Sequence, residues 1–148
     1  MKQPVIPSGV SQNVAWTLQK GSWITHITVT ILVKVLYAQL FNPNLSWQLT
    51  ILTYNFCSFI FFHWIIGDPF DHQYCGHTFW EQMTEQLENS PSLIFLCVYP
   101  VVLFIIGNHI VEWNAIMFYL CVFSLCIVII PKFGFMHRKR LFGIRGDK

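Results

Sequence analysis

The sequence contains little charge. Only 11% of its 148 residues are charged, whereas 54% are hydrophobic and 17% are aromatic; an average soluble domain has about 25% charged residues. A chain of this length forms one domain, and a single core cannot bury so many apolar side chains. These proportions exclude an ordinary soluble domain and predict that much of the apolar surface faces lipid.

Clustered positive charge and paired cysteines are also lacking. The net charge is only +2, and the nine Lys and Arg residues are scattered, so the basic stripe that nucleic-acid-binding proteins need is missing. We therefore expect no nucleic-acid partner. The five cysteines include no C-x-x-C pair, which argues against a zinc cage or a disulfide framework. We interpret them as small buried apolar residues.

Residues 1–21 lack the apolar stretch of a cleaved signal peptide, which is about 7 to 15 residues long. Pro4 and Pro7 disfavour a helix in this region. The prediction is an extended cytoplasmic N-terminal segment over residues 1–21 that is retained, so that the first membrane helix acts as the targeting signal. Such a segment can lie in a groove on another protein; a disordered tail is the alternative.

Four stretches are apolar and long enough to be considered as membrane spans: residues 22–41, 45–66, 92–107 and 113–130. A spanning helix needs about 20 mostly apolar residues and at least about 17, which makes the third stretch marginal. Helix-breaking residues separate the first stretch from the second and the third from the fourth. The predicted fold is all-α: one domain over residues 1–148, an integral membrane bundle of four transmembrane helices in two helical hairpins.

The basic residues fall on one side of this predicted bundle. Lys2 and Lys20 precede the first span, six basic residues lie within residues 131–148, and the two hairpin turns contain none. Basic residues are retained on the cytoplasmic side of a membrane. We therefore expect both termini to be cytoplasmic, with residues 131–148 forming a basic tail.

The loop between the two hairpins contains the pattern of a short helix. Thr78 and Glu81 have the spacing of a capping box, and apolar residues recur at four-residue steps through Phe79, Met83 and Leu87. The prediction is a short amphipathic helix in the cytoplasmic loop, lying on the membrane surface. We expect its glutamates, Glu81 included, to face water or a partner.

Polar residues are concentrated in the first hairpin. His26, Thr30 and Lys34 follow one another at four-residue steps, which places them on one face of a helix. Polar groups in hydrocarbon face a bundle interior, a cavity or another protein. The stripe therefore indicates either contacts between the helices of this chain or contacts with a partner.

The chain lacks a P-loop, a nucleophile elbow and an H-E-x-x-H motif, so we expect no enzyme activity. We interpret His63 as a helix-end residue that is hydrogen-bonded within the bundle. His72, Cys75 and His77 are of the types that bind zinc, but no second ligand pair follows them. The alternative of a metal-dependent or histidine-dependent membrane enzyme is therefore disfavoured, and no metal or cofactor is expected.

Several short motifs occur in an order that resembles the Orm (ORMDL) family. They span nearly the whole chain and are Asn13 through Gly21-Ser22-Trp23, the run from Phe61 to Phe70, Trp80-Glu81-Gln82, Ile130-Pro131-Lys132 and the run from His137 to Ile144. The resemblance implies a four-span protein of the endoplasmic reticulum membrane with cytoplasmic termini, which agrees with the topology expected from charge.

The resemblance also implies a function. It indicates a non-catalytic regulatory subunit that binds the catalytic subunits of serine palmitoyltransferase and inhibits them in response to ceramide, thereby controlling sphingolipid synthesis. The pyridoxal phosphate cofactor belongs to that partner. Ceramide would lie between the two proteins, with the N-terminal segment held where it obstructs substrate access. The alternative is a membrane scaffold or assembly factor for the same enzyme that does not sense lipid.

The implied ceramide contacts are Asn13, Phe61 and Phe79. Asn13 matches the family position that contacts the ceramide head, and an amide can both donate to and accept from a hydroxyl and an amide. Phe61 and Phe79 would contact the lipid through their rings. The remaining residues implied by the motifs have partner or structural roles and are Trp16, Trp23, His63, Trp80, Glu81 and Gln82.

Overall fold

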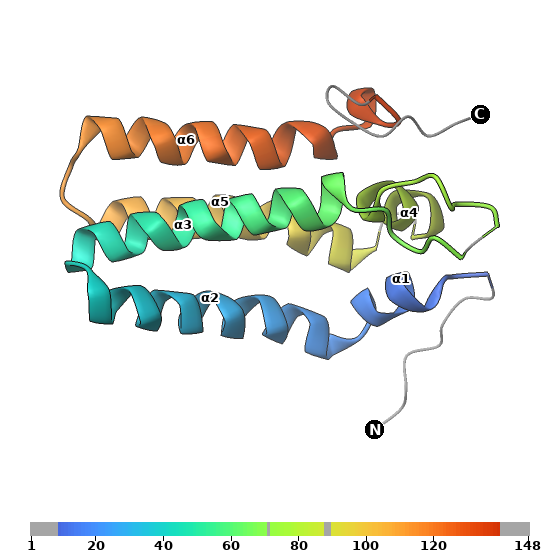
Figure 1. Ribbon diagram of the computed structural model, residues 1–148, viewed down its shortest axis with the longest axis horizontal. Coiled ribbons are helices and arrows are strands. Elements are labelled where there is room, and N and C mark those ends of the chain that lie inside the picture. The colour runs from blue at the N-terminus through green and yellow to red at the C-terminus, as the bar shows by residue number, and fades with distance from the viewer. Residues whose placement is uncertain (1–8, 71, 88–89, 140–148) are drawn as a thin grey trace.

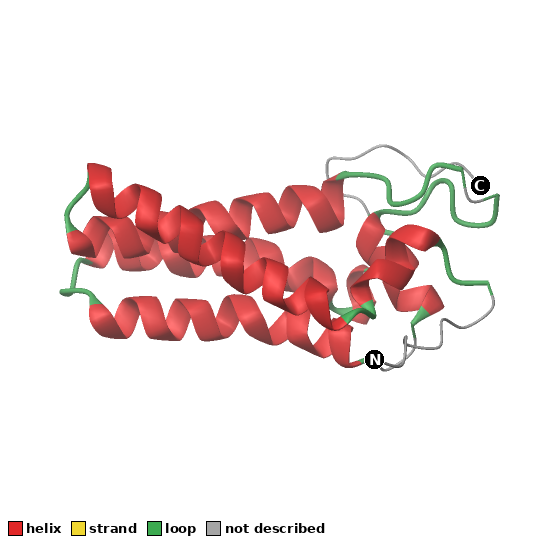
Figure 2. Ribbon diagram, turned by 90° about the horizontal axis from the view of Figure 1, so that it is seen from below, coloured by secondary structure: helices red, strands yellow, loops and turns green. Residues whose placement is uncertain are grey.

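The structure is a computed structural model that describes residues 9–70, 72–87 and 90–139. Four long helices lie side by side, and short helices gather at one end of the bundle (Figures 1 and 2). The long helices are α2 (Lys20–Leu40), α3 (Pro43–Phe59), α5 (Pro91–Ile110) and α6 (Ala115–Ile129). The short elements are α1 (Gln12–Thr17), η1 (Ile60–Trp64), α4 (Phe79–Gln86), η2 (Ile130–Lys132) and η3 (Gly134–Met136).

The predicted all-α fold is confirmed, and the chain is a multi-pass membrane protein. Four segments are long and apolar enough to cross a membrane: Gly21–Leu40, Pro43–Trp64, Pro91–Ile110 and Ala115–Lys132. The third is 20 residues long, because Pro91 occupies the first turn and the Ser90 hydroxyl caps it by accepting from the Ser92 N–H. That span is therefore longer than the marginal stretch expected over residues 92–107.

The N-terminal segment differs from the expected extended conformation at residues 12–17, which form α1. Within the described residues of this segment no proline interrupts the chain, and Val14, Ala15 and Thr17 are buried. Packing of this short apolar face on the bundle outweighs the cost of starting a helix. Pro4 and Pro7, on which the expectation rested, lie outside the described residues.

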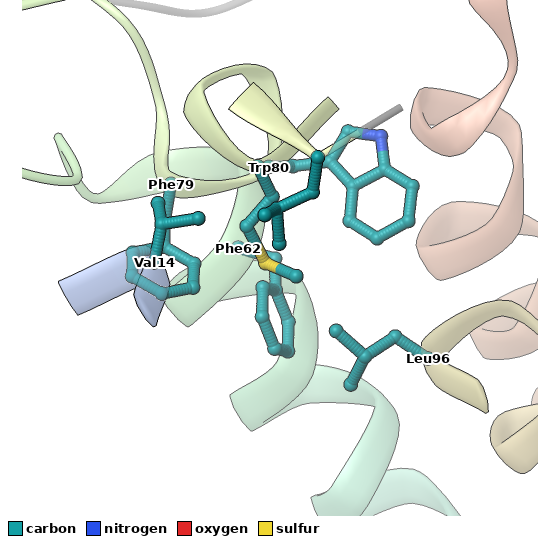
Figure 3. Packing of buried hydrophobic residues seen from close by; sticks show 7 residues of the cluster. Val14, Phe62, Phe79, Trp80 and Leu96 are labelled. Carbon is teal, nitrogen blue, oxygen red and sulfur yellow. The ribbon is translucent and has the colours of Figure 1, made fainter. Parts of the chain in front are cut away.

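One hydrophobic cluster joins the short helices to the bundle (Figure 3). Val14 of α1, Phe62 of η1, Phe79 and Trp80 of α4, and Leu96 of α5 are all at most 6% exposed. Burial of one such side chain contributes about 1.5–3 kcal/mol. The cluster therefore fixes α1 and α4 at one end of the bundle, which is called the α4 end below. The opposite end contains the α2–α3 and α5–α6 turns and is called the hairpin end.

The capping box of α4 is confirmed. The Thr78 hydroxyl accepts from the Glu81 N–H, and the Glu81 carboxylate accepts from the Thr78 N–H at 2.8 Å. The expectation that Glu81 faces water or a partner is wrong, because only 6% of the residue is exposed. Its carboxylate makes hydrogen bonds within the protein: besides the Thr78 N–H, it accepts from the Arg138 N–H at 3.1 Å.

Gln82 fixes the loop that leads into α4. Its side chain is fully buried; the amide oxygen accepts from the Asp68 N–H at 2.8 Å, and the amide nitrogen donates to the Tyr74 carbonyl at 2.9 Å. A Cβ atom on Gly67 would collide with this side chain. The close approach of loop and helix therefore requires glycine at position 67.

Lys132 compensates for a proline inside a membrane helix. Pro100 of α5 has no N–H to donate to the Leu96 carbonyl, and the Lys132 ammonium donates to that carbonyl instead, at 2.6 Å. The ammonium also lies 5.3 Å from the ring centre of Trp80 and 5.8 Å from that of Phe62, within the range of a cation–π interaction. One side chain thus links η2 to α5, α4 and η1.

Glu85 binds the chain that follows α6. Its carboxylate accepts from the Arg138 guanidinium at 2.8 Å and lies 2.9 Å from His137 Nε2 and 3.6 Å from His77 Nε2. Burial acts to raise the pKa of Glu85, but the hydrogen bonds from Arg138 and His137 outweigh it and hold the pKa below its ordinary value of 4.5. Glu85 was expected to face water or a partner, but it binds His137 and Arg138 of this chain. These contacts are called the Glu85 clasp below.

Lys132→Met is expected to destabilise the protein, because the Leu96 carbonyl then loses the ammonium donor that replaces the proline N–H. Hydrogen bonds to charged groups are worth about 1.5–3 kcal/mol. Thermal unfolding in detergent micelles measures the loss, with Lys139→Met, at an exposed tail position, as the matched control.

In a Pro100→Ala background the effect of Lys132→Met should shrink, because the restored N–H serves the same carbonyl. Equal effects in both backgrounds would contradict the assignment.

The Glu85 clasp is expected to weaken in acid. Because the folded-state pKa of Glu85 is lowered, its stabilisation is complete above the unfolded value of about 4.5 and is lost as the pH falls through the folded-state pKa. Glu85→Gln should remove this part of the pH dependence and leave α4 in place. Amide hydrogen exchange of residues 133–139 at pH 7 and pH 4 is the measurement. An identical acid response in the wild type and in Glu85→Gln would refute it.

Candidate functional site

A narrow crevice opens where α1 meets α2, η1 and α4. Its lining includes four of the residues that the sequence motifs singled out, namely Trp16, Trp23, Phe61 and Phe79. The cavity measures only about 20 Å³, which is room for about one water molecule. A larger ligand can therefore lie against the mouth of the crevice but not inside it.

The joint between α1 and α2 is held by hydrogen bonds to α5. The Thr17 carbonyl, at the end of α1, accepts from the Ser22 hydroxyl at 2.9 Å and from the Ser92 hydroxyl at 2.6 Å. Ser92 in turn accepts from the Trp23 indole N–H at 3.4 Å. Because Ser92 begins a membrane span, these bonds hold the N-terminal helix against the bundle.

A second set of contacts holds α1 against α4. The Gln86 amide oxygen accepts from the Ser11 N–H at 3.0 Å, and Val14 is completely buried in the cluster shared with Phe62 and Met83. α1 has only six residues, so it depends on these contacts, because a helix this short is not stable alone.

The side of the crevice opposite α1 is aromatic. The rings of Phe61 and Phe79 lie 5.1 Å apart, and that of Phe62 lies 5.1 Å from Phe61 and 5.6 Å from Phe79. Phe61 and Phe62 belong to the π-helical turn η1. The Ile65 N–H closes this turn by donating to the Ile60 carbonyl at 3.0 Å. That turn leaves Phe61 48% exposed while Phe62 is buried, so Phe61 is free to contact a lipid chain or a partner.

Asn13 does not line the crevice. It lies on the exposed side of α1, three residues before Trp16, which is 42% exposed. Residues three apart share a helix face. Asn13 and Trp16 therefore form one exposed strip that leads from the surface of α1 to the mouth of the crevice.

The other motif residues have structural positions. Trp80, Glu81 and Gln82 are buried and fix α4. His63 packs its ring 6.0 Å from that of Phe59 and 5.8 Å from that of Trp80. The expectation of a hydrogen-bonded His63 is wrong for Nε2, which is buried with no partner in the described part of the chain.

The polar stripe of α2 joins the helices of this chain. His26 Nδ1 lies 3.2 Å from the Tyr54 hydroxyl, and the Thr30 hydroxyl accepts from that of Tyr99 at 2.9 Å. The Lys34 ammonium lies over an aromatic ring of α3. Of the two sequence interpretations, the structure supports contacts within the bundle, and His26 also lines the crevice.

Sequence reasoning missed Ser22, Ser92 and Thr17. Serine and threonine are common in membrane helices, and Thr17 and Ser92 are separated by 75 positions. Their sequence signals were position at helix ends and, for Thr17 and Ser22, the motif that runs from Asn13 to Trp23. Among the described residues no three His, Cys, Asp or Glu are placed to hold a metal ion, and His77 instead faces Glu85.

Comparison with known proteins finds relatives that all belong to one family. A sequence model of the ORMDL family matches residues 11–140. Protein ORM1 of Saccharomyces pastorianus is 35% identical over 87% of this chain and 91% of its own length. Protein ORM2 of Saccharomyces cerevisiae is 34% identical over 94% of this chain and 65% of its own length. ORM1-like protein 2 of Mus musculus is 31% identical over 97% of this chain and 98% of its own length.

The matched region begins at the first residue before α1 and includes all four spans, the crevice and the Glu85 clasp. Orm proteins are regulators and not catalysts, and the family supports a role in the regulation of sphingolipid metabolism. Because the family model matches residues 11–140, and 98% of the mouse relative is covered, this protein belongs to the ORMDL family.

Proposed function

We propose that this protein is a regulatory subunit of serine palmitoyltransferase that inhibits the enzyme when ceramide accumulates in the endoplasmic reticulum membrane. Family membership supports a regulatory role. The proposal of ceramide-dependent inhibition rests on one observation: α1 docks beside an exposed aromatic group at the edge of the membrane-spanning bundle. α1 is the element that responds to lipid, and the catalytic subunits supply the surface that it blocks.

The chemistry around α1 suits a ceramide. Phe61 offers an exposed ring to an acyl chain, and Asn13 offers an amide that can donate to and accept from the ceramide hydroxyl and amide. The crevice itself is too small for a headgroup. The lipid therefore lies across its mouth, and the partner enzyme forms the other wall. Phe79 is 6% exposed and supports the ring of Phe61 from behind.

Ceramide changes activity in this scheme through differential affinity. A ligand shifts a conformational equilibrium only if it binds one state more tightly than the other. A ceramide that contacts both Asn13 on α1 and Phe61 on η1 stabilises the arrangement in which α1 is docked. That arrangement holds α1 over the substrate entrance of the enzyme, so the end product of the pathway lowers its own synthesis.

Both termini are cytoplasmic in this proposal. The described ends of the chain lie at the same end of the bundle (Figure 1), and that end carries Lys132, Arg138 and Lys139. The positive-inside rule assigns this end to the cytoplasm. The crevice then lies at the cytoplasmic membrane surface.

Asn13→Ala and Phe61→Ala are each expected to blunt the ceramide response. Serine palmitoyltransferase activity is measured in proteoliposomes with and without this protein, over a ceramide titration. Loss of one hydrogen bond of about 0.5–1.5 kcal/mol raises the ceramide concentration for half-maximal inhibition by up to about tenfold. Gln12→Ala, an exposed amide on the same helix, and Phe56→Ala, an exposed ring elsewhere on α3, are the matched controls.

Deletion of residues 1–18 should abolish inhibition and leave co-purification with the enzyme intact, because the four spans remain. If the wild type co-purifies with the enzyme but activity does not change with ceramide, the sensing proposal fails. The protein is then a scaffold for the enzyme.

A further inference from the structure

A second, larger cavity lies at the hairpin end of the bundle, away from α1 and α4. It measures about 140 Å³ and is formed by α3, the end of α5, the turn after it and the start of α6. A cavity of about 150 Å³ holds a molecule of the size of benzene. The site therefore has room for a small chemical group such as a lipid headgroup amine.

The lining carries one sign of charge. Glu112 is its only charged residue, and Asn44 of the α2–α3 turn fixes its position: the Asn44 amide nitrogen donates to the Glu112 carboxylate at 3.2 Å, and the Asn44 amide oxygen accepts from the Glu112 N–H at 3.3 Å. The carboxylate thus stands at the cavity in a defined orientation. With no basic residue in the lining, the site attracts a cation.

The amides of the lining add hydrogen-bond acceptors. Asn108 uses its amide nitrogen to donate to the Phe104 carbonyl at 2.9 Å, which leaves its amide oxygen for a ligand. Gln48 is 4% exposed and lines the cavity. Its amide makes no hydrogen bond to another residue in the described ranges. Because its amide atoms are not fully enclosed by protein, a ligand in the cavity can reach them.

The remaining wall is aromatic and apolar. The rings of Trp113 and Phe118 lie 4.8 Å apart, and aromatic faces attract ammonium groups. The exposed side chains of Ile110 and Ile116 lie close by along the chain, on spans that face the bilayer. The carboxylate, the free amide oxygens and the aromatic rings suit an ammonium that carries N–H donors, and the apolar flanks suit the acyl chains attached to it.

We propose that this cavity binds the primary ammonium of an ethanolamine phospholipid from the membrane leaflet at the hairpin end. The ammonium donates to the Glu112 carboxylate and to the amide oxygens of Asn108 and Gln48. A choline headgroup has no N–H and satisfies none of these acceptors by hydrogen bonding. The site shares no lining residue with the crevice beside α1, so lipid binding here can be tested independently of the ceramide response.

The test compares two lipids with identical acyl chains. Full-length protein is titrated with dioleoyl phosphatidylethanolamine or dioleoyl phosphatidylcholine in detergent, and bound lipid is counted by native mass spectrometry. The wild type should bind the ethanolamine lipid about tenfold more tightly than the choline lipid. Glu112→Gln, which keeps the size of the side chain, should abolish that preference. Gln12→Ala, at the α4 end, should retain it.

A second variant keeps the proposal testable if Glu112→Gln folds poorly. Asn114 caps α6 by accepting from the Met117 N–H, and aspartate is an equally good cap, so Asn114→Asp should fold and should increase the preference for the ethanolamine lipid several-fold. Equal binding of the two lipids by the wild type, or an unchanged preference in both variants, overturns the proposal.

Discussion

The α4 end of this protein depends on one ammonium group. Pro100 leaves the Leu96 carbonyl without its helical donor, and Lys132 supplies the missing hydrogen bond from a different span. In hydrocarbon an unsatisfied carbonyl costs several kcal/mol, so the proline and the lysine are physically coupled. The rings of Phe62 and Trp80 surround the same ammonium. The cluster on which α1 rests is therefore assembled around a charge that the proline makes necessary.

The two ends of the bundle satisfy polar groups in different ways. At the α4 end, long side chains cross between elements, as Gln82 does to the loop before α4 and Glu85 to the chain after α6. In the middle, short polar side chains pair between spans, for example Asn55 with Ser124 at 2.9 Å. At the hairpin end, Asn42 and Asn114 cap helices, and a cavity with a buried glutamine is left. Sites for ligands arise where this pairing is incomplete.

The regulation proposed for α1 requires that its docking be weak enough to change. Six residues, the Thr17 carbonyl, one glutamine contact and one buried valine hold it. Elements with few contacts open at low free energy. A lipid or a partner that adds one or two contacts would then shift the population, which is the property that the proposed function needs.

The elements that depend on local chemistry could be predicted from the sequence. Run length and hydropathy predicted four spans, and the spacing of Thr78 and Glu81 predicted the cap of α4, because span length and capping involve residues close together in the chain. Three features came from tertiary packing instead: residues 12–17 are helical, Glu81 is buried, and His63 Nε2 has no partner among the described residues. Tertiary packing also brought Ser92 to Thr17, and Glu112 to Asn44. These outcomes depend on contacts between residues tens of positions apart, and such contacts leave no periodic pattern in a single sequence.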